Sequence, residues 1–262
     1  MSQTLPTMRA DWALFLDVDG TLLDFAETPE QVSVPSGVPD LLRALHDFLG
    51  GALALVSGRP IATLDRLFAP LRLPAAGQHG AELRATALGE IVRTPPPSHL
   101  AEVSAGLRRF AATHPGILVE DKNASVAVHY RRAPQFRDEL EAFTRAAIAT
   151  NNEHMEILEA VMAFDVKLRS VDKGRAVAWF MNRPPFTGRV PVFIGDDHTD
   201  EYGFAEVAER AGYAIQVGTS RPRVTPWHIA TPADLRQWLR AGFAELAATG
   251  ARTSPKEAPC RG

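Results

Sequence analysis

Two aspartates separated by one residue follow a short apolar segment near the start of the chain. Residues 13–16 read Ala-Leu-Phe-Leu, and Asp17 and Asp19 come next, before Gly20 and Thr21. Side chains two residues apart on a β-strand share a face, and open α/β sheets bind ligands beyond the carboxyl ends of their strands. We therefore expect a nucleophile and a proton-transfer group in one site. The alternative is a strand that ends in a polar turn, because Asp, Gly and Thr are common turn formers.

A second acidic segment is suited to complete a metal site with this pair. Close carboxylates repel unless a cation or a shared proton compensates them, and carboxylate oxygens favour Mg²⁺. The segment Gly195-Asp-Asp-His-Thr-Asp-Glu201 follows the apolar residues 192–194. Helix capping explains one or two of its acids. Asp196 leaves the strand at the edge expected for Asp17 and Asp19, so we predict that it binds the same metal, while Asp197 and Asp200 orient waters or Lys173.

Two further positions suggest phosphate binding. Ser57 and Gly58 follow the apolar residues 52–56, and the Ser57 hydroxyl and the Gly58 amide can donate to a phosphate oxygen. A plain strand-to-helix turn uses the same residue types. Lys173 begins a predicted helix, where the helix dipole disfavours a cation, and a bound phosphate would compensate it. A solvent-screened surface lysine is the alternative there.

Other polar residues give weaker indications. His79 lies in Gln78-His79-Gly80, and because the chain has no second histidine at ligand spacing, we expect a structural or substrate-contacting role. The charged residues of the middle segment fit a solvated strand face, which is the usual place of such charges. They are Glu120, Lys122, Arg131 and Arg132.

The elements that position these residues alternate between strand and helix. Helical spacing is present at 38–49 and 61–68 around the apolar run 52–56, and the alternation resumes downstream. The downstream elements are a helix at 173–181, a strand at 190–194, a helix at 199–211, a strand at 213–217 and a helix at 233–247. Such alternation predicts an α/β fold with a doubly wound parallel sheet.

An insertion separates the two halves. It opens with Pro95-Pro96-Pro97 and repeats a helix-strand-strand pattern twice, which is enough for a small α+β domain of about 70 residues. Its predicted elements are a helix at 100–113, strands at 117–120 and 125–130, a helix at 134–150, and strands at 155–159 and 161–167. We therefore expect core parts at 1–94 and 169–248, the inserted domain at 95–168, and a mobile tail at 249–262.

Composition narrows the function classes. The 262 residues are 45% hydrophobic with a net charge of −3, so the chain can bury a core and has no general attraction for nucleic acid or anionic membranes. Cys260 is the single cysteine, which excludes an internal disulfide. With neither a signal-like segment nor a long apolar run, we expect a cytoplasmic protein that binds a small molecule. The sequence leaves the oligomeric state open.

Together these pieces resemble a known superfamily. Asp17-x-Asp19-Gly-Thr, Ser57, Lys173-Gly and Gly195-Asp196-Asp197 are similar to the four motifs of haloacid-dehalogenase-like phosphohydrolases. The segments 78–82, 120–131 and 195–201 further resemble trehalose-6-phosphate phosphatases, and the likeness extends from Asp17 to about Val217. It implies a Rossmann-like core with the insertion as an α+β cap, and Mg²⁺-dependent hydrolysis of trehalose 6-phosphate.

The resemblance also implies roles in the core. Asp17 would attack phosphorus to give an aspartyl-phosphate, and Asp19 would protonate the sugar leaving group and then deprotonate the attacking water. Mg²⁺ would be held by Asp17, the backbone carbonyl of Asp19, and Asp196. Ser57, with Gly58, and Lys173 would neutralise the phosphoryl oxygens.

In the cap, the resemblance implies that Glu120, Lys122 and Arg131 grip the sugar, and His79 is a further candidate contact. The chain departs from the family pattern at two positions, where a glutamate and a lysine are usual and Asp165 and Val161 stand instead. Asp165 is one methylene shorter, and Val161 has no donor. A lost polar contact costs about 1 kcal/mol or more, so the sugar preference is expected to be weaker or altered.

Several alternatives are left open by the residues. A phosphatase of another sugar phosphate, of the sucrose 6-phosphate or glycosyl-glycerate phosphate type, fits the same motifs, and a substrate panel separates the two. A sugar phosphomutase would not release free phosphate, and a dehalogenase has no need of the acid Asp19. A non-catalytic sugar-phosphate sensor or a regulatory partner of a synthase would bind without turnover.

Overall fold

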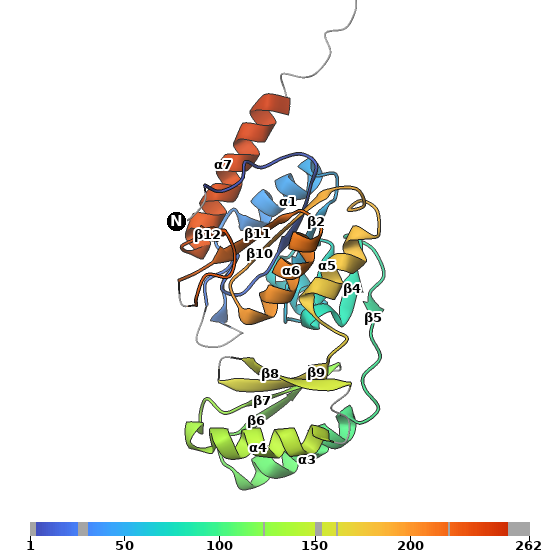
Figure 1. Ribbon diagram of the computed structural model, residues 1–262, viewed down its shortest axis with the longest axis vertical. Coiled ribbons are helices and arrows are strands. Elements are labelled where there is room, and N and C mark those ends of the chain that lie inside the picture. Colours follow the sequence, from blue (N-terminus) through green and yellow to red (C-terminus); the bar gives the residue numbers. More distant parts are fainter. Residues whose placement is uncertain are drawn as a thin grey trace, which may run out of the picture.

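The structure is a computed structural model that describes residues 4–25, 31–122, 124–149, 154–160, 162–219 and 221–250 (Figure 1). Within these residues the chain forms an eight-stranded sheet in the order β12-β11-β10-β1-β2-β3-β4-β5 and a separate four-stranded sheet in the order β6-β7-β9-β8. The large sheet consists of β1 (Trp12–Leu16), β2 (Leu53–Val56), β3 (Ala75–Gly77), β4 (Glu82–Arg84), β5 (Val92–Arg93), β10 (Val190–Gly195), β11 (Tyr213–Val217) and β12 (Trp227–Ile229).

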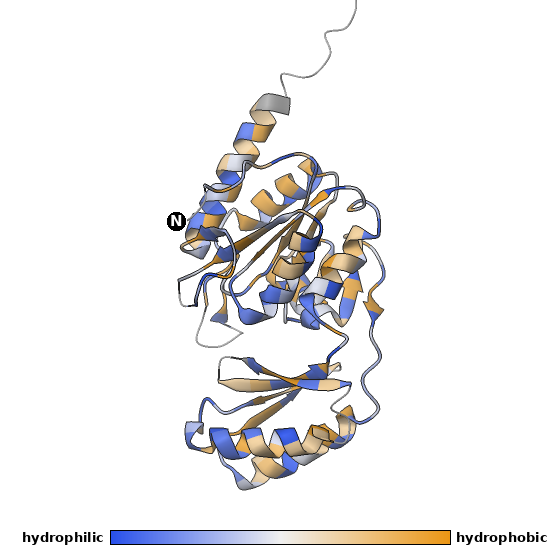
Figure 2. Ribbon diagram, viewed as in Figure 1, coloured by the Kyte–Doolittle hydropathy of each residue, from blue (hydrophilic) through white to orange (hydrophobic). Residues whose placement is uncertain are grey.

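The central strands of the large sheet are parallel and buried. From β12 to β3 every neighbouring pair is parallel, whereas β4 and β5 extend the sheet antiparallel. All five residues of β1 are buried, and Phe15 pairs with Phe193 of β10. Strands covered on both faces read as continuous apolar runs, which explains why residues 13–16 and 192–194 show no alternation (Figure 2).

The helices cover both faces of this sheet, as a doubly wound fold requires. The chain moves from β1 to β2 in one direction and from β10 to β11 in the other, so right-handed crossovers place the helices on opposite faces. Accordingly, α5 packs against α6 and α1 packs against α7. These helices and α2 are α1 (Val38–Phe48), α2 (Ile61–Leu67), α5 (Lys173–Met181), α6 (Glu201–Glu209) and α7 (Pro232–Gly250).

The inserted segment forms the antiparallel cap sheet with two helices on one face. It comprises α3 (Leu100–Thr113), β6 (Leu118–Asp121), β7 (Ser125–His129), the 3-10 turn η3 (Pro134–Phe136), α4 (Arg137–Ile148), β8 (Met155–Ala160) and β9 (Ala163–Leu168). Val126, Val128, Phe164 and Val166 join Leu107 and Leu140 in the cap's hydrophobic cluster. Figure 1 shows the sheet between these helices and the core, so the alternate side chains of β7 and β9 face the core.

The predicted fold class is confirmed, including the α+β insertion and its repeated helix-strand-strand order. The short strands β3, β4, β5 and β12 were not predicted. The last predicted helix is α7, which continues to Gly250, and residues 251–262 of the predicted tail lie outside the described residues. The domain boundaries at 94 and 168 stay a prediction. Among the described residues, no helix combines the length and the apolarity that a bilayer-spanning segment needs.

Candidate active site

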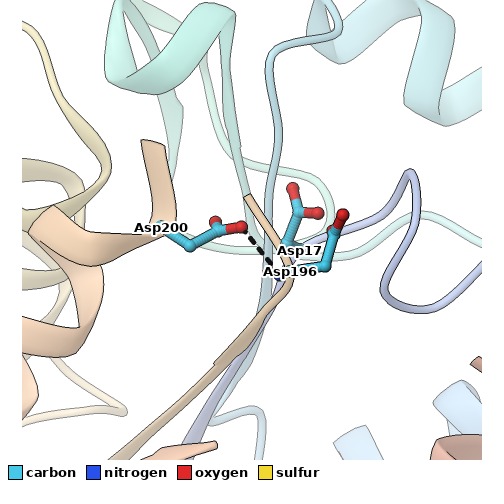
Figure 3. A group of neighbouring side chains, drawn as sticks. All are labelled: Asp17, Asp196 and Asp200. Carbon is cyan, nitrogen blue, oxygen red and sulfur yellow. Dashed lines mark hydrogen bonds between the residues drawn. The ribbon is translucent and has the colours of Figure 1, made fainter. Parts of the chain in front are cut away.

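Asp17 and Asp196 lie close together because they follow two neighbouring parallel strands, β1 and β10. Leu16 pairs with Ile194 at the ends of β1 and β10, and the backbone N–H of Asp17 donates to Ile194 O at 2.9 Å. Asp196 follows Ile194 by two residues, with Gly195 between them. Figure 3 shows Asp17 and Asp196 side by side, with Asp200 directed toward them. One carboxylate oxygen from each of these three residues lies within 4.8 Å of the others.

Lys173 is buried within this group. Its Nζ donates to Asp17 Oδ1 at 2.8 Å and to Asp200 Oδ1 at 2.6 Å. Burial alone would lower the pKa of Lys173, but the adjacent carboxylates raise it above its ordinary value. The ammonium at the start of α5 is thus compensated by two carboxylates in addition to any phosphate that binds.

Three carboxylates around one ammonium leave net negative charge in a buried place. Burial raises the pKa of Asp17 well above its usual value, and the charges of Asp200 and Asp196 add to this while Lys173 opposes it. Burial also raises the pKa of Asp196 to about 6, although its Oδ1 accepts a hydrogen bond from Thr21 Oγ1 at 2.7 Å. A divalent cation bound to oxygen ligands would remove this excess, so the donor set fits a hard metal ion.

Asp200 organises the loop after β10. Its Oδ2 accepts the backbone N–H groups of Asp196 and Asp197 at 3.0 and 2.9 Å, and its side chain is fully buried. Together with Asp197 it forms a reciprocal cap on the 3-10 turn η5 (His198–Asp200). Gly195 is required beside it, because a Cβ there would lie 2.3 Å from Asp200 Cγ.

Asp197 lies farther out than Asp200. Its Oδ1 accepts from Arg221 Nη1 at 3.3 Å and also contacts the ring of His198. The two acids that the sequence grouped together are therefore separated by the structure: Asp200 contacts Lys173, and Asp197 pairs with residues at the surface.

Asp19 is gripped by an arginine that sequence reasoning had given no role. Arg59 Nε donates to Asp19 Oδ2 and Arg59 Nη2 to Asp19 Oδ1, both at 2.7 Å. Arg59 stood in the Ser57-Gly58-Arg59-Pro60 segment, but its partner lies 40 residues away, and no local signal indicates that pairing.

The segment after β3 forms backbone hydrogen bonds with the Ser57–Pro60 turn. The backbone N–H of Gln78 donates to Arg59 O and that of His79 to Ser57 O, each at 3.0 Å. The buried carboxylate of Glu82 accepts the N–H of Ile61 at 2.8 Å. Glu82 was also missed as a functional position, although it belongs to the 78–82 segment. These contacts fix Ser57 and Gly58 at the same sheet edge as Asp17.

His79 packs directly over the turn. It lies in the 3-10 turn η2 (Gln78–Gly80) with a φ of +57°, and a Cβ on Gly58 would lie 2.8 Å from its Nε2. Burial, with the charge of Lys173 adding to it, lowers the pKa of His79 to about 3. The imidazole is therefore neutral, and its buried Nδ1 has no hydrogen-bond partner among the described residues.

The cap contributes charged residues from the sheet face toward the core. Glu120, Ala127, Asp165 and Leu158 form one row across its four strands. Lys122 Nζ donates to Asp165 Oδ2 at 2.9 Å. Burial would raise the pKa of Asp165, but the charge of Lys122 holds it below its usual value. Asp165 Oδ1 is buried and finds no partner within the part of the chain that the structure describes.

Glu120 lies in the same row as Asp165 but has a different partner. Glu120 Oε2 contacts His129 Nε2 at 3.0 Å, and Arg131 is exposed just beyond β7. Val161, the second departure from the family pattern, lies outside the described residues. Cap and core touch where the backbone N–H of Ala124 donates to Gln78 Oε1 at 3.4 Å. The β6–β7 turn, next to Lys122, thus rests on the segment that supports Ser57.

The arrangement therefore combines the buried carboxylate of Asp17 at a strand end with the ammonium of Lys173, which contacts it. Two further carboxylates, those of Asp196 and Asp200, lie beside them, and the turn at Ser57 and Gly58 offers hydrogen-bond donors. This combination suits transfer of a phosphoryl group to a carboxylate.

Comparison with known proteins agrees with this chemistry. Residues 15–235 match the model of the trehalose-phosphatase family. The chain is 43% identical over 218 residues to a protein of Sinorhizobium fredii called probable trehalose-phosphate phosphatase, covering 83% of this chain and 82% of that one. It is 38% identical over 234 residues to the trehalose-6-phosphate phosphatase of Escherichia coli, covering 89% and 87%.

A solved structure gives the same picture of the fold. The C-terminal domain of the C. albicans trehalose-6-phosphate phosphatase superposes with a TM-score of 0.77 at 20% identity, covering 89% of this chain and 92% of that one. The residues that match the family model run from β1 to the start of α7 and include Asp17, Ser57, Lys173 and Asp196. The chain therefore belongs to the trehalose-phosphatase family.

Proposed function

We propose that this protein hydrolyses trehalose 6-phosphate to trehalose and inorganic phosphate in a Mg²⁺-dependent reaction. The observation that carries the proposal is the group formed by buried Asp17 and Asp200, which contact Lys173, and partly buried Asp196, in a chain of this family. The charge balance and the lone cysteine support a cytoplasmic enzyme that acts on a free sugar phosphate rather than on nucleic acid or membrane.

In the first step we infer that a carboxylate oxygen of Asp17 attacks phosphorus and the bond from phosphorus to the sugar oxygen breaks. Asp19 gives that oxygen a proton, and an aspartyl-phosphate remains on Asp17. In the second step Asp19 takes a proton from a water that attacks phosphorus. Phosphate leaves, and both carboxyl groups return to their starting states.

Charge on the phosphoryl oxygens is compensated by fixed groups. The Ser57 hydroxyl, the Gly58 N–H and the Lys173 ammonium are proposed to bind these oxygens, since all three lie at the sheet edge beside Asp17. Such donors are positioned before the reaction starts, so little reorganisation is needed as charge develops.

Asp17, Asp196 and the backbone carbonyl of Asp19 are the residues that would hold Mg²⁺. When bound, the ion supplies positive charge beside the phosphoryl group. The raised pKa values of Asp17 and Asp196 support this assignment, because they indicate carboxylates held together without enough positive charge. We propose that Asp200 acts by holding Lys173 and the loop after β10.

The cap is proposed to select the sugar. Glu120, Lys122, Arg131 and Asp165 would contact its hydroxyls, and the neutral His79 would do so from the core side. Closure of the cap would exclude bulk water from the aspartyl-phosphate and admit only phosphates whose sugar fits. Because Asp165 is short and is engaged by Lys122, a related sugar phosphate is the second candidate substrate.

A substrate panel tests the proposal. Phosphate release is measured with trehalose 6-phosphate, sucrose 6-phosphate and glucose 6-phosphate at equal concentration, with and without Mg²⁺. We expect the highest kcat/KM for trehalose 6-phosphate and no release without the metal. A higher kcat/KM for another sugar phosphate would replace the substrate, and tight binding without any release would indicate a sensor.

A further inference from the structure

Arg59 and Asp19 form a two-pronged ion pair beside the catalytic group. Both contacts are 2.7 Å long and involve both oxygens of the carboxylate. The side chains are 13% and 27% exposed, so the pair is shielded from water more than a typical surface ion pair. Charge-assisted bidentate contacts of this kind are strong and directional. As the structure stands, Asp19 is committed to Arg59.

This commitment conflicts with the proton transfer proposed for Asp19. A general acid must place its proton within about 3 Å of the leaving oxygen. An Asp19 oxygen that accepts from Arg59 points at the guanidinium instead. At least one of the two contacts must therefore open before Asp19 can act on the substrate.

Arg59 is located where a bound phosphate can replace Asp19 as its partner. It follows Ser57 and Gly58 directly, and its backbone N–H donates to Ser57 Oγ at 3.1 Å. A guanidinium recognises phosphate in the same planar, two-pronged geometry as a carboxylate. A phosphate dianion carries more negative charge than a carboxylate, so it competes well for the same donors.

The backbone at Arg59 is anchored on both sides. Its carbonyl accepts from the N–H of Gln78 at 3.0 Å, and two residues later the N–H of Ile61 is bound by Glu82. An exchange of partners therefore involves the Arg59 side chain and leaves the phosphate-binding turn in place.

We propose that Arg59 is a positioning residue for Asp19: it holds the carboxylate while the site is without phosphate and transfers to the phosphate when the substrate binds. Once released from Arg59, Asp19 takes up a proton from solvent and turns toward the leaving oxygen, so the acid is formed only when a substrate is present. This inference rests on the proposed function, because it takes Asp19 as the group that moves the proton.

A binding cycle tests the exchange without turnover. Calorimetry measures the Kd of inorganic phosphate, with Mg²⁺ present, for the full chain, for Asp19→Ala, for Arg59→Met and for the double variant. If Asp19 competes for Arg59, Asp19→Ala tightens phosphate binding about fivefold or more, as coupled neighbours allow. In the Arg59→Met background the same change should tighten it less than about twofold.

Simple removal of a negative charge would tighten phosphate equally in both backgrounds. Equal tightening, or no tightening in the full chain, would overturn the exchange. Arg59→Lys keeps the charge but lacks the fork, so Asp19→Ala should tighten phosphate less there than in the full chain. This second background keeps the test valid if thermal unfolding shows that Arg59→Met does not fold.

The matched control is Arg66→Met on α2, an exposed arginine that contacts Thr63 and lies outside the site. It should bind phosphate like the full chain. The outcomes also separate the two proposals. A chain that shows the coupling but fails to hydrolyse trehalose 6-phosphate would refute the proposed function alone, and hydrolysis with an additive cycle would refute the exchange alone.

Discussion

The stability of the protein below neutral pH is expected to depend on His79. Burial, followed by the charge of Lys173, lowers the pKa of this imidazole to about 3 in the folded protein. In the unfolded chain a histidine titrates near 6.5. At pH 5 the unfolded state therefore binds a proton that the folded state does not. A lowered folded pKa of a histidine gives stability that is present above pH 6.5 and is lost as the pH falls toward 3.

The size of the loss follows from these two pKa values. Each pH unit below 6.5 removes about 1.4 kcal/mol, so the free energy of unfolding should fall by about 2 kcal/mol between pH 6.5 and pH 5 through this residue alone. That is a large part of a typical total of about 5–15 kcal/mol. The variant His79→Asn removes the titration, and asparagine tolerates the left-handed φ of +57° at this position.

Urea unfolding of the metal-free protein at pH 7.5 and pH 5 measures this contribution. The pH-induced loss in the unmodified chain should exceed the loss in His79→Asn by about 2 kcal/mol. Taking the difference between the two proteins cancels the contributions of other titrating groups to the pH dependence. Asp196 is one of them, and its raised pKa increases the stability of the folded state as the pH falls. His99→Asn removes an exposed histidine and serves as the control. Equal losses in the unmodified chain and in His79→Asn would refute the reasoning.

Three further predictions concern the catalytic group. Asp17→Asn removes the proposed nucleophile but keeps its shape, so phosphate release from trehalose 6-phosphate should stop while thermal unfolding still shows a folded protein. Release at the normal rate would exclude Asp17 as the nucleophile. The proposed Mg²⁺ site needs an ionised Asp196, whose pKa burial raises to about 6. Calorimetry should therefore show the affinity for Mg²⁺ falling at least about tenfold per pH unit below 6, and an unchanged affinity from pH 7 to 5 would contradict the proposal. Gly195→Ala places a Cβ 2.3 Å from Asp200 Cγ and should lower the free energy of unfolding by about 1–3 kcal/mol. The control Gly106→Ala in α3, where a Cβ has an ordinary contact at 3.7 Å, should not lower it. Similar free energies of unfolding for the two variants would argue against the close approach at Gly195.

The parts of the fold that follow from local pattern were predictable from the sequence. The buried strands β1 and β10 are continuous apolar runs that end in acids, and parallel neighbours in a doubly wound sheet bring such ends together. The strands that escaped prediction have too few residues for a period. β3 is Ala-Ala-Gly, and β5 is the exposed pair Val92 and Arg93.

Side-chain partners distant in the sequence were harder to predict. Lys173 was expected to need a phosphate, with Asp200 as a possible partner, but Asp17, which is 156 residues away, also compensates its charge. Arg59 had no expected role, and the structure pairs it with Asp19. In each case the residue type was informative, but the identity of its partner depends on the tertiary fold rather than on spacing.

The glycines at positions 58 and 195 favour a packed site over a plain turn at the motifs around Ser57 and Asp196. A turn explains a glycine through its backbone, and Gly20, with a φ of +83°, fits that explanation. Gly58 and Gly195 do not lie in the left-handed region, so backbone freedom does not account for them. What they share is a missing Cβ that would collide with His79 and with Asp200 respectively. A turn alone places no such demand, because it arises where another group lies directly against the glycine, as His79 and Asp200 do here.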